Sequence, residues 1–269
     1  MADSFDHSKF IKLTNFSGGW IWVSHVNEHI NKLLPLLDAI SKEKLKEIWL
    51  IIGAEEKPWK PYEDTVFCVI ISPLPDFIIL LVFNKGDEEF PSELKVFYDK
   101  KSLSVPTEDA YVFTEIYLEL IRQIAKSENI LIIETQDIIS LGDLAEKHPN
   151  LEREKILHDI IGQRFEPITY IDQKTAKAIA DSLEIDFLPD WKHEKSEWAL
   201  EFKLFQDLSI FYIKYSQKAS SNLKIYYHVS VLKYNLEIIM NFSWLFLNAI
   251  IREGRKILGD KMPKISEFL

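Results

Sequence analysis

The sequence predicts an α+β fold in which one α-β-β-β-α unit occurs twice, with antiparallel meanders flanked by helices. Two observations support this prediction. Residues 75–99 and 206–228 present the same order of features, and Trp59 and Trp191 precede them at nearly equal distances. Apolar residues alternate in the segments that resemble strands and recur at helical spacing in the segments that follow. Because internal repeats fold as similar units, we expect a pseudo-twofold molecule.

Three strands are predicted in the first repeat, at residues 65–72, 77–83 and 93–99. The middle segment is apolar at every position, which is typical of a strand that is buried on both faces. In the second repeat, residues 197–205 alternate between apolar and polar side chains. One face of that strand should therefore collect four apolar side chains, Trp198, Leu200, Phe202 and Leu204.

Helices should precede and follow each set of strands. We expect a helix over residues 27–48 with a break near Pro35, because proline lacks the N–H that a helix interior uses. The next helix should start with Thr107 as its N-cap, since a hydroxyl can accept from the free N–H groups of the first turn. In the second repeat we expect helices at residues 174–183 and after Asn235.

The repeats suggest a division of the chain into three parts. Residues 1–125 form the first repeat, residues 126–164 a connector, and residues 165–269 a second repeat whose sequence has diverged. The connector should hold a short strand and then a helix that ends near a glycine, at 130–134 and 151–162 respectively. We expect the parts to form one compact molecule.

Charge and cysteine content exclude several classes of function. The formal net charge is −10 and the pI is about 5.3, which disfavours nucleic acid and anionic membranes, because both attract basic surfaces. The single cysteine, Cys68, allows neither an internal disulfide nor a thiolate-bound cluster. The most apolar stretch, residues 238–251, is shorter than the roughly 20 residues that span a bilayer. We expect a cytoplasmic protein, monomeric or weakly dimeric, without a membrane partner.

An acidic loop, residues 83–91, joins two of the predicted strands and contains three consecutive acids, Asp87, Glu88 and Glu89. Gly86 should supply a positive φ, and Phe90 should pack back onto the core. The loop is then either a solvated hairpin tip or a binding site for cations or a basic partner. The corresponding loop of the second repeat, residues 215–221, has no acid, so the hairpin itself does not require the acids.

Further carboxylates follow the second strand of this hairpin. If the chain folds back after Asp99, then Asp99, Glu108 and Asp109 could join the acidic loop. Carboxylate oxygens bind Mg²⁺ or Ca²⁺, and they also pair with Lys and Arg. The candidate metal ligands are three of these acids, Asp87, Glu89 and Asp99, although their spacing matches no known metal loop. The plain alternative is a set of solvated acids.

The remaining chemistry-bearing residues have structural explanations. His25 and His29 are four residues apart, but Asn27 resembles a helix start, which places His25 outside the helix. Cys68 lies within a predicted strand and should be a buried, inert thiol. Trp59 lies in a polar loop and is either a plug over the sheet or a contact residue for a partner. The sequence shows no glycine-rich phosphate loop, and it indicates no cofactor.

The first repeat resembles an uncharacterised prokaryotic family of unknown function. The resemblance covers about residues 17–125 and rests on the motifs at residues 86–91, 97–99 and 106–109, with a further element at residues 19–23. These motifs correspond to the family patterns G-D-E-E-F-P, L-F-D, T-E-D and G-x-W. Where the family has a tryptophan two residues before the glycine, this chain has Asn84. The resemblance implies no activity.

Two hypotheses of function follow. In the first, the protein is a non-catalytic interaction or accessory protein, and the acidic loop with Trp59 nearby forms its binding face. In the second, it is a ligand- or cofactor-handling protein, for instance an enzyme, with a carboxylate-lined pocket that binds a metal or another cation. The sequence favours the first, because no catalytic constellation is visible.

Overall fold

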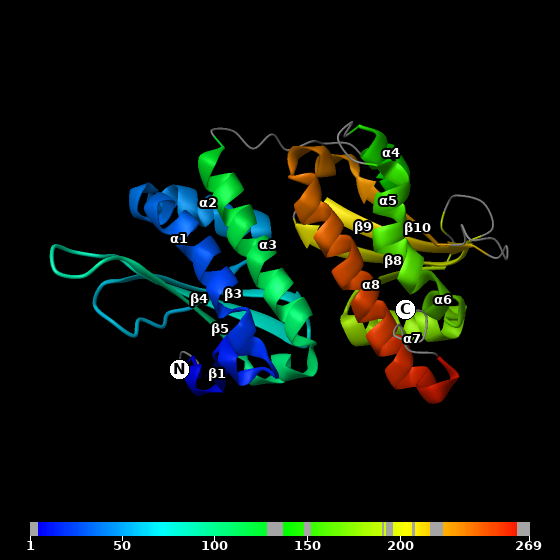
Figure 1. Cartoon of the computed structure of the whole chain (residues 1–269), viewed down its shortest axis with the longest axis horizontal. Helices are drawn as coiled ribbons and strands as arrows, with labels where there is room; N and C mark the ends of the chain where they lie inside the picture. The colour runs from blue at the N-terminus through cyan, green and yellow to red at the C-terminus, as the bar shows by residue number, and fades with distance from the viewer. Residues whose placement is uncertain are drawn as a thin grey trace. The chain divides into compact units, whose positions relative to one another are not determined.

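The computed structural model of the chain describes residues 5–127, 137–147, 152–189, 191, 196–205, 208–215 and 223–262 (Figure 1). The chain divides into two units, Met1–Leu131 and Ile132–Leu269. Each unit combines helices with one antiparallel sheet of five strands, which confirms the expected α+β class. None of the helices in these ranges is both long and apolar enough to cross a membrane.

The sheet of the first unit has the strand order β1-β5-β4-β3-β2. Its strands are β1 (Phe10–Ile11), β2 (Glu55–Glu56), β3 (Thr65–Leu74), β4 (Phe77–Asn84) and β5 (Glu93–Asp99). Its helices are α1 (Val23–Ala39), α2 (Lys42–Ile52) and α3 (Thr107–Lys126). Strands β3, β4 and β5 form the expected meander. The edge strands β1 and β2 were not predicted, because two residues are too few to show alternation.

The sheet of the second unit has the order β6-β10-β9-β8-β7. Its strands are β6 (Ile138–Ser140), β7 (Asp186–Leu188), β8 (Ser196–Phe205), β9 (Leu208–Tyr215) and β10 (Leu223–His228). Its helices are α4 (Leu141–Glu146), α5 (Arg153–Leu157), α6 (Gln163–Thr169), α7 (Gln173–Leu183) and α8 (Leu236–Leu258). The strand expected at residues 130–134 lies outside the described residues.

The segment between the two predicted repeats contributes to the second unit. Its residues form edge strand β6, and a π-helical turn, His158–Gly162, joins α5 to α6 without a break. The helix therefore does not end near Gly162 as expected, since the glycine keeps a right-handed φ of −49° and the chain remains helical to Thr169. Without a left-handed φ, this glycine cannot stop the helix.

The two units agree in topology and in strand register at nearly constant offsets in residue number. Pairing begins at Thr65 in the β3–β4 hairpin and at Ser196 in the β8–β9 hairpin, and both hairpins have two register shifts at corresponding places. Helices α2 and α7 are each 11 residues long, and each ends at a left-handed residue, Gly53 and Glu184. This agreement fits a duplicated unit.

A long helix crosses one face of each sheet, α3 in the first unit and α8 in the second (Figure 1). Phe113 of α3 stacks on Phe77 of β4 at 5.2 Å between ring centroids. The Tyr98 hydroxyl of β5 lies 2.7 Å from Thr114 Oγ1. Because Thr114 donates its own proton to the Ala110 carbonyl at 2.8 Å, Tyr98 is the donor in the bond between them.

The second unit repeats this bond at the corresponding positions. Tyr227 of β10 lies 2.7 Å from Ser243 Oγ, and Ser243 donates to the Ile239 carbonyl of its own helix at 2.6 Å. Tyr212 of β9 adds a bond to the Ser243 carbonyl at 2.8 Å. These groups are buried, and a buried hydroxyl without a partner is unfavourable, so the bonds fix where α8 crosses the sheet.

Three predicted details are wrong at the level of single residues. The break between the first two helices falls at Ile40, because Ser41 caps α2, while Pro35 lies inside α1. Thr107 does not cap α3; its hydroxyl donates instead to the Ser17 carbonyl at 2.8 Å. Leu204 does not share the buried face of β8, because a register shift near the end of the strand turns Phe205 inward in its place. The cap at Asn235 is confirmed.

Removing either tyrosine hydroxyl should weaken the fold by a similar amount. We expect Tyr98→Phe and Tyr227→Phe each to lower the free energy of unfolding by about 1 kcal/mol, because each deletes one buried hydrogen bond without creating a large cavity. Urea titration followed by circular dichroism measures the change. Tyr170→Phe is the control, since Tyr170 is 45% exposed. Equal stability of all three variants and the wild type would contradict the assigned role.

Candidate functional site

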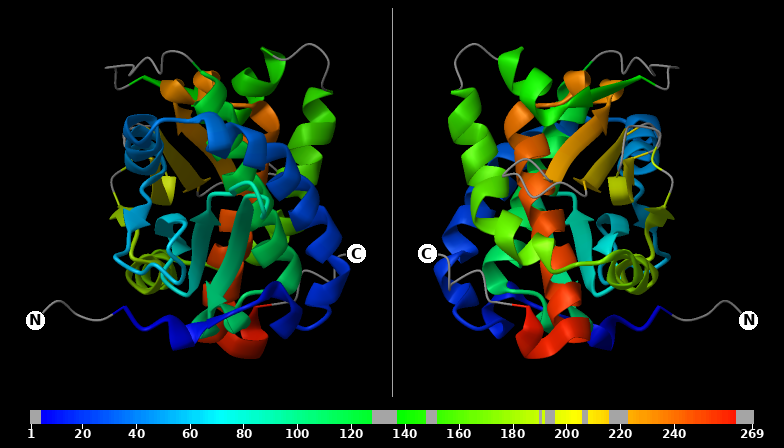
Figure 2. Two further views of the ribbon diagram at one scale, coloured as in Figure 1. Left: turned by 90° about the vertical axis from the view of Figure 1, so that its left-hand side faces the viewer. Right: turned by 90° about the vertical axis from the view of Figure 1, so that its right-hand side faces the viewer.

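The acidic loop forms an ordered tip on the β4–β5 hairpin. The tip projects from the first unit in Figure 1 and faces the viewer in the left panel of Figure 2. The Asp87 carboxylate accepts the backbone N–H groups of Glu89 and Phe90, both at 2.8 Å. The Asp87 N–H donates to the Phe90 carbonyl at 2.9 Å. These bonds close a compact turn within the loop.

Gly86 is needed in this tip because the backbone approaches it closely, and not because of the positive φ that the sequence analysis expected. Its φ is not positive; within the described chain, the glycines with positive φ are Gly18, Gly53 and Gly259. A Cβ at position 86 would instead lie 2.5 Å from the backbone nitrogen of Ser92 and 2.6 Å from the Phe90 carbonyl oxygen. The loop backbone folds too closely over this position for any side chain.

Phe90 does not pack onto the core, as the sequence analysis expected. Its side chain is 67% exposed, because the closed turn directs it outward at the apex of the hairpin. The three acids beside it, Asp87, Glu88 and Glu89, are exposed as well. The tip therefore presents one large aromatic ring within an acidic surface.

The other predicted carboxylates do not join this tip. Asp99 lies at the far end of β5, roughly 20 Å along the strand from the loop. There it accepts the Lys101 N–H at 2.9 Å and caps a short 3-10 turn. Glu108 is exposed and Asp109 is buried in the first turn of α3. The structure thus separates the candidate acids into two groups at opposite ends of one strand.

The two histidines lie on one helix, contrary to expectation, because α1 begins at Val23. His29 Nε2 lies 2.9 Å from Glu115 Oε1 of α3, and this hydrogen bond holds the pKa of Glu115 below its usual range. His25 packs edge-on against Tyr111 at 5.9 Å between ring centroids. Across the described residues, no three His, Cys, Asp or Glu side chains are grouped so that they could hold a metal ion.

Trp59 packs against the sheet and also borders a pocket. It lies beside the cluster of Cys68, Leu80 and Val82, and its ring stacks on His7 at 4.9 Å. Burial raises the pKa of the Cys68 thiol to about 11, so the thiol is neutral at physiological pH. In the second unit, Trp191 similarly packs on a strand, against a ring of β9 at 4.9 Å.

The pocket beside Trp59 has a volume of about 460 Å³, and most of the charged residues that line it are basic. Four lysines border it, Lys42, Lys46, Lys57 and Lys60, against a single glutamate, Glu56. The sequence does contain a signal for this pocket, since Lys42 and Lys46 are four residues apart on α2 and so share one helix face. Their convergence with the Trp59 loop depends on the tertiary structure.

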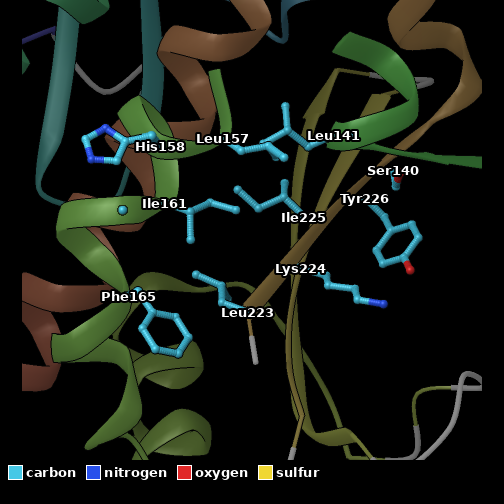
Figure 3. Close-up of a pocket in the computed structure, with 12 residues that line it drawn as sticks. Ser140, Leu141, Leu157, His158, Ile161, Phe165, Leu223, Lys224, Ile225 and Tyr226 are labelled. Atoms are coloured by element: carbon cyan, nitrogen blue, oxygen red, sulfur yellow. The ribbon is translucent and has the colours of Figure 1, made fainter. Parts of the chain in front are cut away.

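A second concave surface lies in the second unit, where sequence analysis predicted no site. Its volume is about 550 Å³, and it separates strand β10 from the helical run of α5, the π-helical turn and α6 (Figure 3). Most of the side chains that face into it are apolar: Leu141, Leu157, Ile161, Phe165, Leu223 and Ile225.

The fold and these surfaces define a two-unit α+β protein with an acidic, aromatic hairpin tip and no recognised catalytic constellation in its described part. Residues 5–119 match the family model described as a domain of unknown function, DUF3786. The match confirms the resemblance inferred from the sequence, and it includes both the hairpin tip and the Trp59 pocket. No curated protein and no solved structure matched the chain significantly.

The order of the hairpin tip should depend on pH in a defined direction. The N–H groups of Phe90 and Glu89 hold the pKa of Asp87 below its ordinary value of about 3.9. Stabilisation of the turn by this carboxylate is therefore complete above the ordinary value and is lost as pH falls through the lower pKa of the folded tip. The amide NMR shifts of both residues should stay constant from neutral pH to about pH 4 and change below it.

Asp87→Ala is the matched control for this titration, because it removes the acceptor without removing the loop. The variant should lose the part of the acid-induced change in both amide shifts that follows protonation of Asp87. A midpoint at or above the ordinary aspartate value in the wild type would contradict the assigned hydrogen bonds.

Proposed function

We propose that the protein is a non-catalytic interaction or accessory protein, and that its hairpin tip binds a basic surface of a partner protein. The observation that supports this most directly is the 67% exposure of Phe90 at the apex of an ordered loop. Burying a large exposed aromatic side chain on docking releases substantial hydrophobic free energy, and aromatic residues are enriched at interfaces for this reason.

The charge around Phe90 defines the chemistry of the partner. Three exposed carboxylates precede Phe90 in the same loop, and the whole chain carries a net charge of −10. Such a surface accelerates encounters with a basic partner and disfavours acidic ones. A partner that fits would offer an apolar pocket rimmed by lysine or arginine. Asp99, Glu108 and Asp109 lie outside this face, and Trp59 contributes to it only if the partner extends beyond the tip.

The order of the tip also favours a role in binding. Asp87 accepts two backbone N–H groups, and the Gly86 N–H donates to Ser92 Oγ at 2.7 Å. Ser92 in turn donates to Asp38 of α1. Because these bonds fix the loop before any partner arrives, little conformational entropy remains to be lost on binding.

We also infer that the second unit is a duplicate of the first in which the acidic tip was lost. The loop that follows β9 has no acidic residue, although the strands on either side pair in the corresponding register. The acids are therefore a property of one unit, as expected of a specialised surface. The proposal places the protein in the cytoplasm, as a monomer or weak dimer.

A second candidate function is supported by the lysine-lined pocket. Three lysines of the pocket, Lys42, Lys46 and Lys60, supply its positive charge, while Lys57 is paired with Glu55. The pocket floor is apolar, with Leu45, Phe67 and Cys68. This combination fits an amphipathic anion, with its charged group at the lysines and its apolar part on the floor. It differs from the carboxylate-lined pocket that the sequence suggested as an alternative, which stays a prediction.

Deleting the Phe90 ring should abolish most of the binding by the tip. Peptides selected from a displayed library with the full chain as bait should be rich in basic and apolar residues, and should bind Phe90→Ala at least ~30-fold more weakly, as hot-spot aromatics do. Glu88→Lys/Glu89→Lys should also weaken binding and remove most of its salt dependence. Biolayer interferometry measures both effects.

Leu103→Ala is the matched control, because Leu103 is 51% exposed on another loop of the same unit. It should leave the selected peptides bound at wild-type affinity. If Phe90→Ala binds them as well as the wild type does, or if the selection yields no binders, the tip is not the binding face.

The lysine pocket is tested with two defined probes, dodecyl phosphate and inorganic pyrophosphate. Calorimetry should show dodecyl phosphate binding to the wild type and at least ~10-fold weaker binding to Lys46→Glu/Lys60→Glu, because the reversed charges repel the phosphate. Pyrophosphate should bind more weakly, since it cannot use the apolar floor. Lys100→Glu, an exposed lysine outside the pocket, is the control. Equal affinity in the wild type and the double variant would refute this candidate.

A further inference from the structure

The groove of the second unit is formed by two facing rows of apolar side chains. Figure 3 shows Leu157, Ile161 and Phe165 of the helical run pointing toward Leu223 and Ile225 of β10. Lys224 and Tyr226, at the intervening positions of the strand, point to its other side (Figure 3). The volume of about 550 Å³ lies within the range of roughly 300–1,000 Å³ that is usual for ligand sites.

Within the described chain, one edge of β10 has no paired strand along this groove. On its inner side, β10 pairs with β9 from Leu223 to Tyr227. On its outer side, it pairs with β6 only at Tyr226, Tyr227 and His228. Over Leu223–Ile225, no strand of the described chain pairs with this outer edge. An open edge offers unpaired N–H and C=O groups to an added strand.

The course of the chain explains why the edge is open. β6 ends at Ser140, whose side chain accepts the Asp143 N–H at 3.1 Å and caps α4. The chain therefore leaves the sheet after the three residues of β6. If β6 continued in the same direction, it would pair with the outer edge of β10 beside the groove. A peptide that occupied this line would extend the sheet and cover the apolar rows at the same time.

The helical wall of the groove contains the π-helical turn, His158–Gly162. A π-helical turn inserts an extra residue into the helix, and such turns are frequent at functional sites. Gly162 lies under the His158 ring, where a Cβ would approach the ring to 3.2 Å. The π-helical turn therefore has a residue without a side chain, Gly162, at the place where the helix borders the groove.

The first unit has a corresponding but smaller groove. It lies between α1 and β5, with a volume of about 240 Å³, and its helical wall is a regular α-helix. Lys95 there forms an ion pair with Glu93 at 2.9 Å and a hydrogen bond to Tyr62 at 3.3 Å. The enlarged groove is therefore specific to the second unit.

Lys224, the lysine beside the larger groove, has different neighbours from those of Lys95. Lys224 is exposed, and its ammonium group lies 5.2 Å from the centre of the Tyr215 ring. The ion pairs of the described residues do not include it. On an added strand, the residue opposite Lys224 would be a cross-strand neighbour, and opposite charges at such positions are stabilising.

We propose that this groove binds an extended peptide of a partner protein, added as a strand to the open edge of β10. Two apolar side chains of the peptide enter the groove between the facing rows. The acidic side chain between them lies on the opposite face and pairs with Lys224. The peptide chemistry is thus apolar–acidic–apolar in extended form, recognised by strand addition. This site is independent of the hairpin tip and lies in the other unit.

The test uses fluorescein-labelled peptides with the central sequence Leu-Glu-Leu, and variants with Val, Ile or Phe at the two apolar positions. Fluorescence anisotropy with the full chain should show saturable binding by at least one of them. Lys224→Glu should weaken binding of that peptide at least ~5-fold and strengthen binding of the same peptide with Lys in place of Glu, because the charges are exchanged. N-methylation of the two apolar residues should abolish binding, because in an antiparallel added strand they lie opposite Leu223 and Ile225, whose N–H and C=O groups face the outer edge as the N–H of Val229 does.

Two further variants separate this site from its counterpart and from a loss of fold. Ile161→Glu places a charge in the groove at a half-buried position and should abolish binding while circular dichroism stays unchanged. Lys95→Glu is the matched control, because it alters the corresponding lysine of the first unit, and it should leave binding unchanged. Hydrogen exchange should show protection of the Leu223 and Ile225 amides when peptide is bound, because their N–H groups face the outer edge.

Several outcomes would overturn the proposal. These are the absence of binding by every peptide, equal binding by the wild type, Lys224→Glu and Ile161→Glu, or a loss of binding in Lys95→Glu alone. A second copy of the chain could also occupy the edge. In that case sedimentation would show concentration-dependent association that Ile161→Glu abolishes, and the occupant would be another copy and not a partner peptide.

Discussion

The position of the long helix on each sheet depends on one buried hydroxyl bond, from Tyr98 to Thr114 in the first unit and from Tyr227 to Ser243 in the second. A tyrosine hydroxyl that is removed from water must find a partner, and here the partner is a helix residue whose own proton is already engaged with the preceding turn. In either unit, sliding the helix along the sheet would break the hydrogen bond between the tyrosine and the helix residue. The helix is therefore held at one crossing point, and this fixes the loops and grooves at its ends.

On this shared framework the two units present different surfaces. In the first unit, an eight-residue hairpin connection, residues 85–92, exposes Phe90 within an acidic cluster. In the second, the helix beside the outer strand contains a π-helical turn and the groove next to it is larger. The residues of the core can keep their places while exposed loops and edges change, because surface substitutions away from the core have little effect on stability. Surface differences of this kind support distinct binding roles for the two units.

Prediction from the sequence succeeded where a long periodic pattern was present. Strands β4 and β5 were recognised to within one residue of their ends, and helices α3 and α8 were recognised close to their N-termini, because each element has many residues that report the same period. It failed at short edge strands and at single residues. The break after α1 follows a capping serine and not Pro35, since α1 accommodates the proline within its length. At the hairpin tip, the predictions of a positive φ for Gly86 and of a buried position for Phe90 were wrong.

The sequence by itself determined the class of fold, the order of the central strands and the acidic character of the hairpin loop, because these depend on local composition and periodicity. Only the tertiary structure decided which acids lie together, since Asp99 and the loop are separated by the length of β5. It also decided that Trp59 borders lysines, and that no strand of the described residues covers the edge of β10 beside an apolar groove. These features arise from residues far apart in the chain, and their meeting depends on where the chain leaves each sheet.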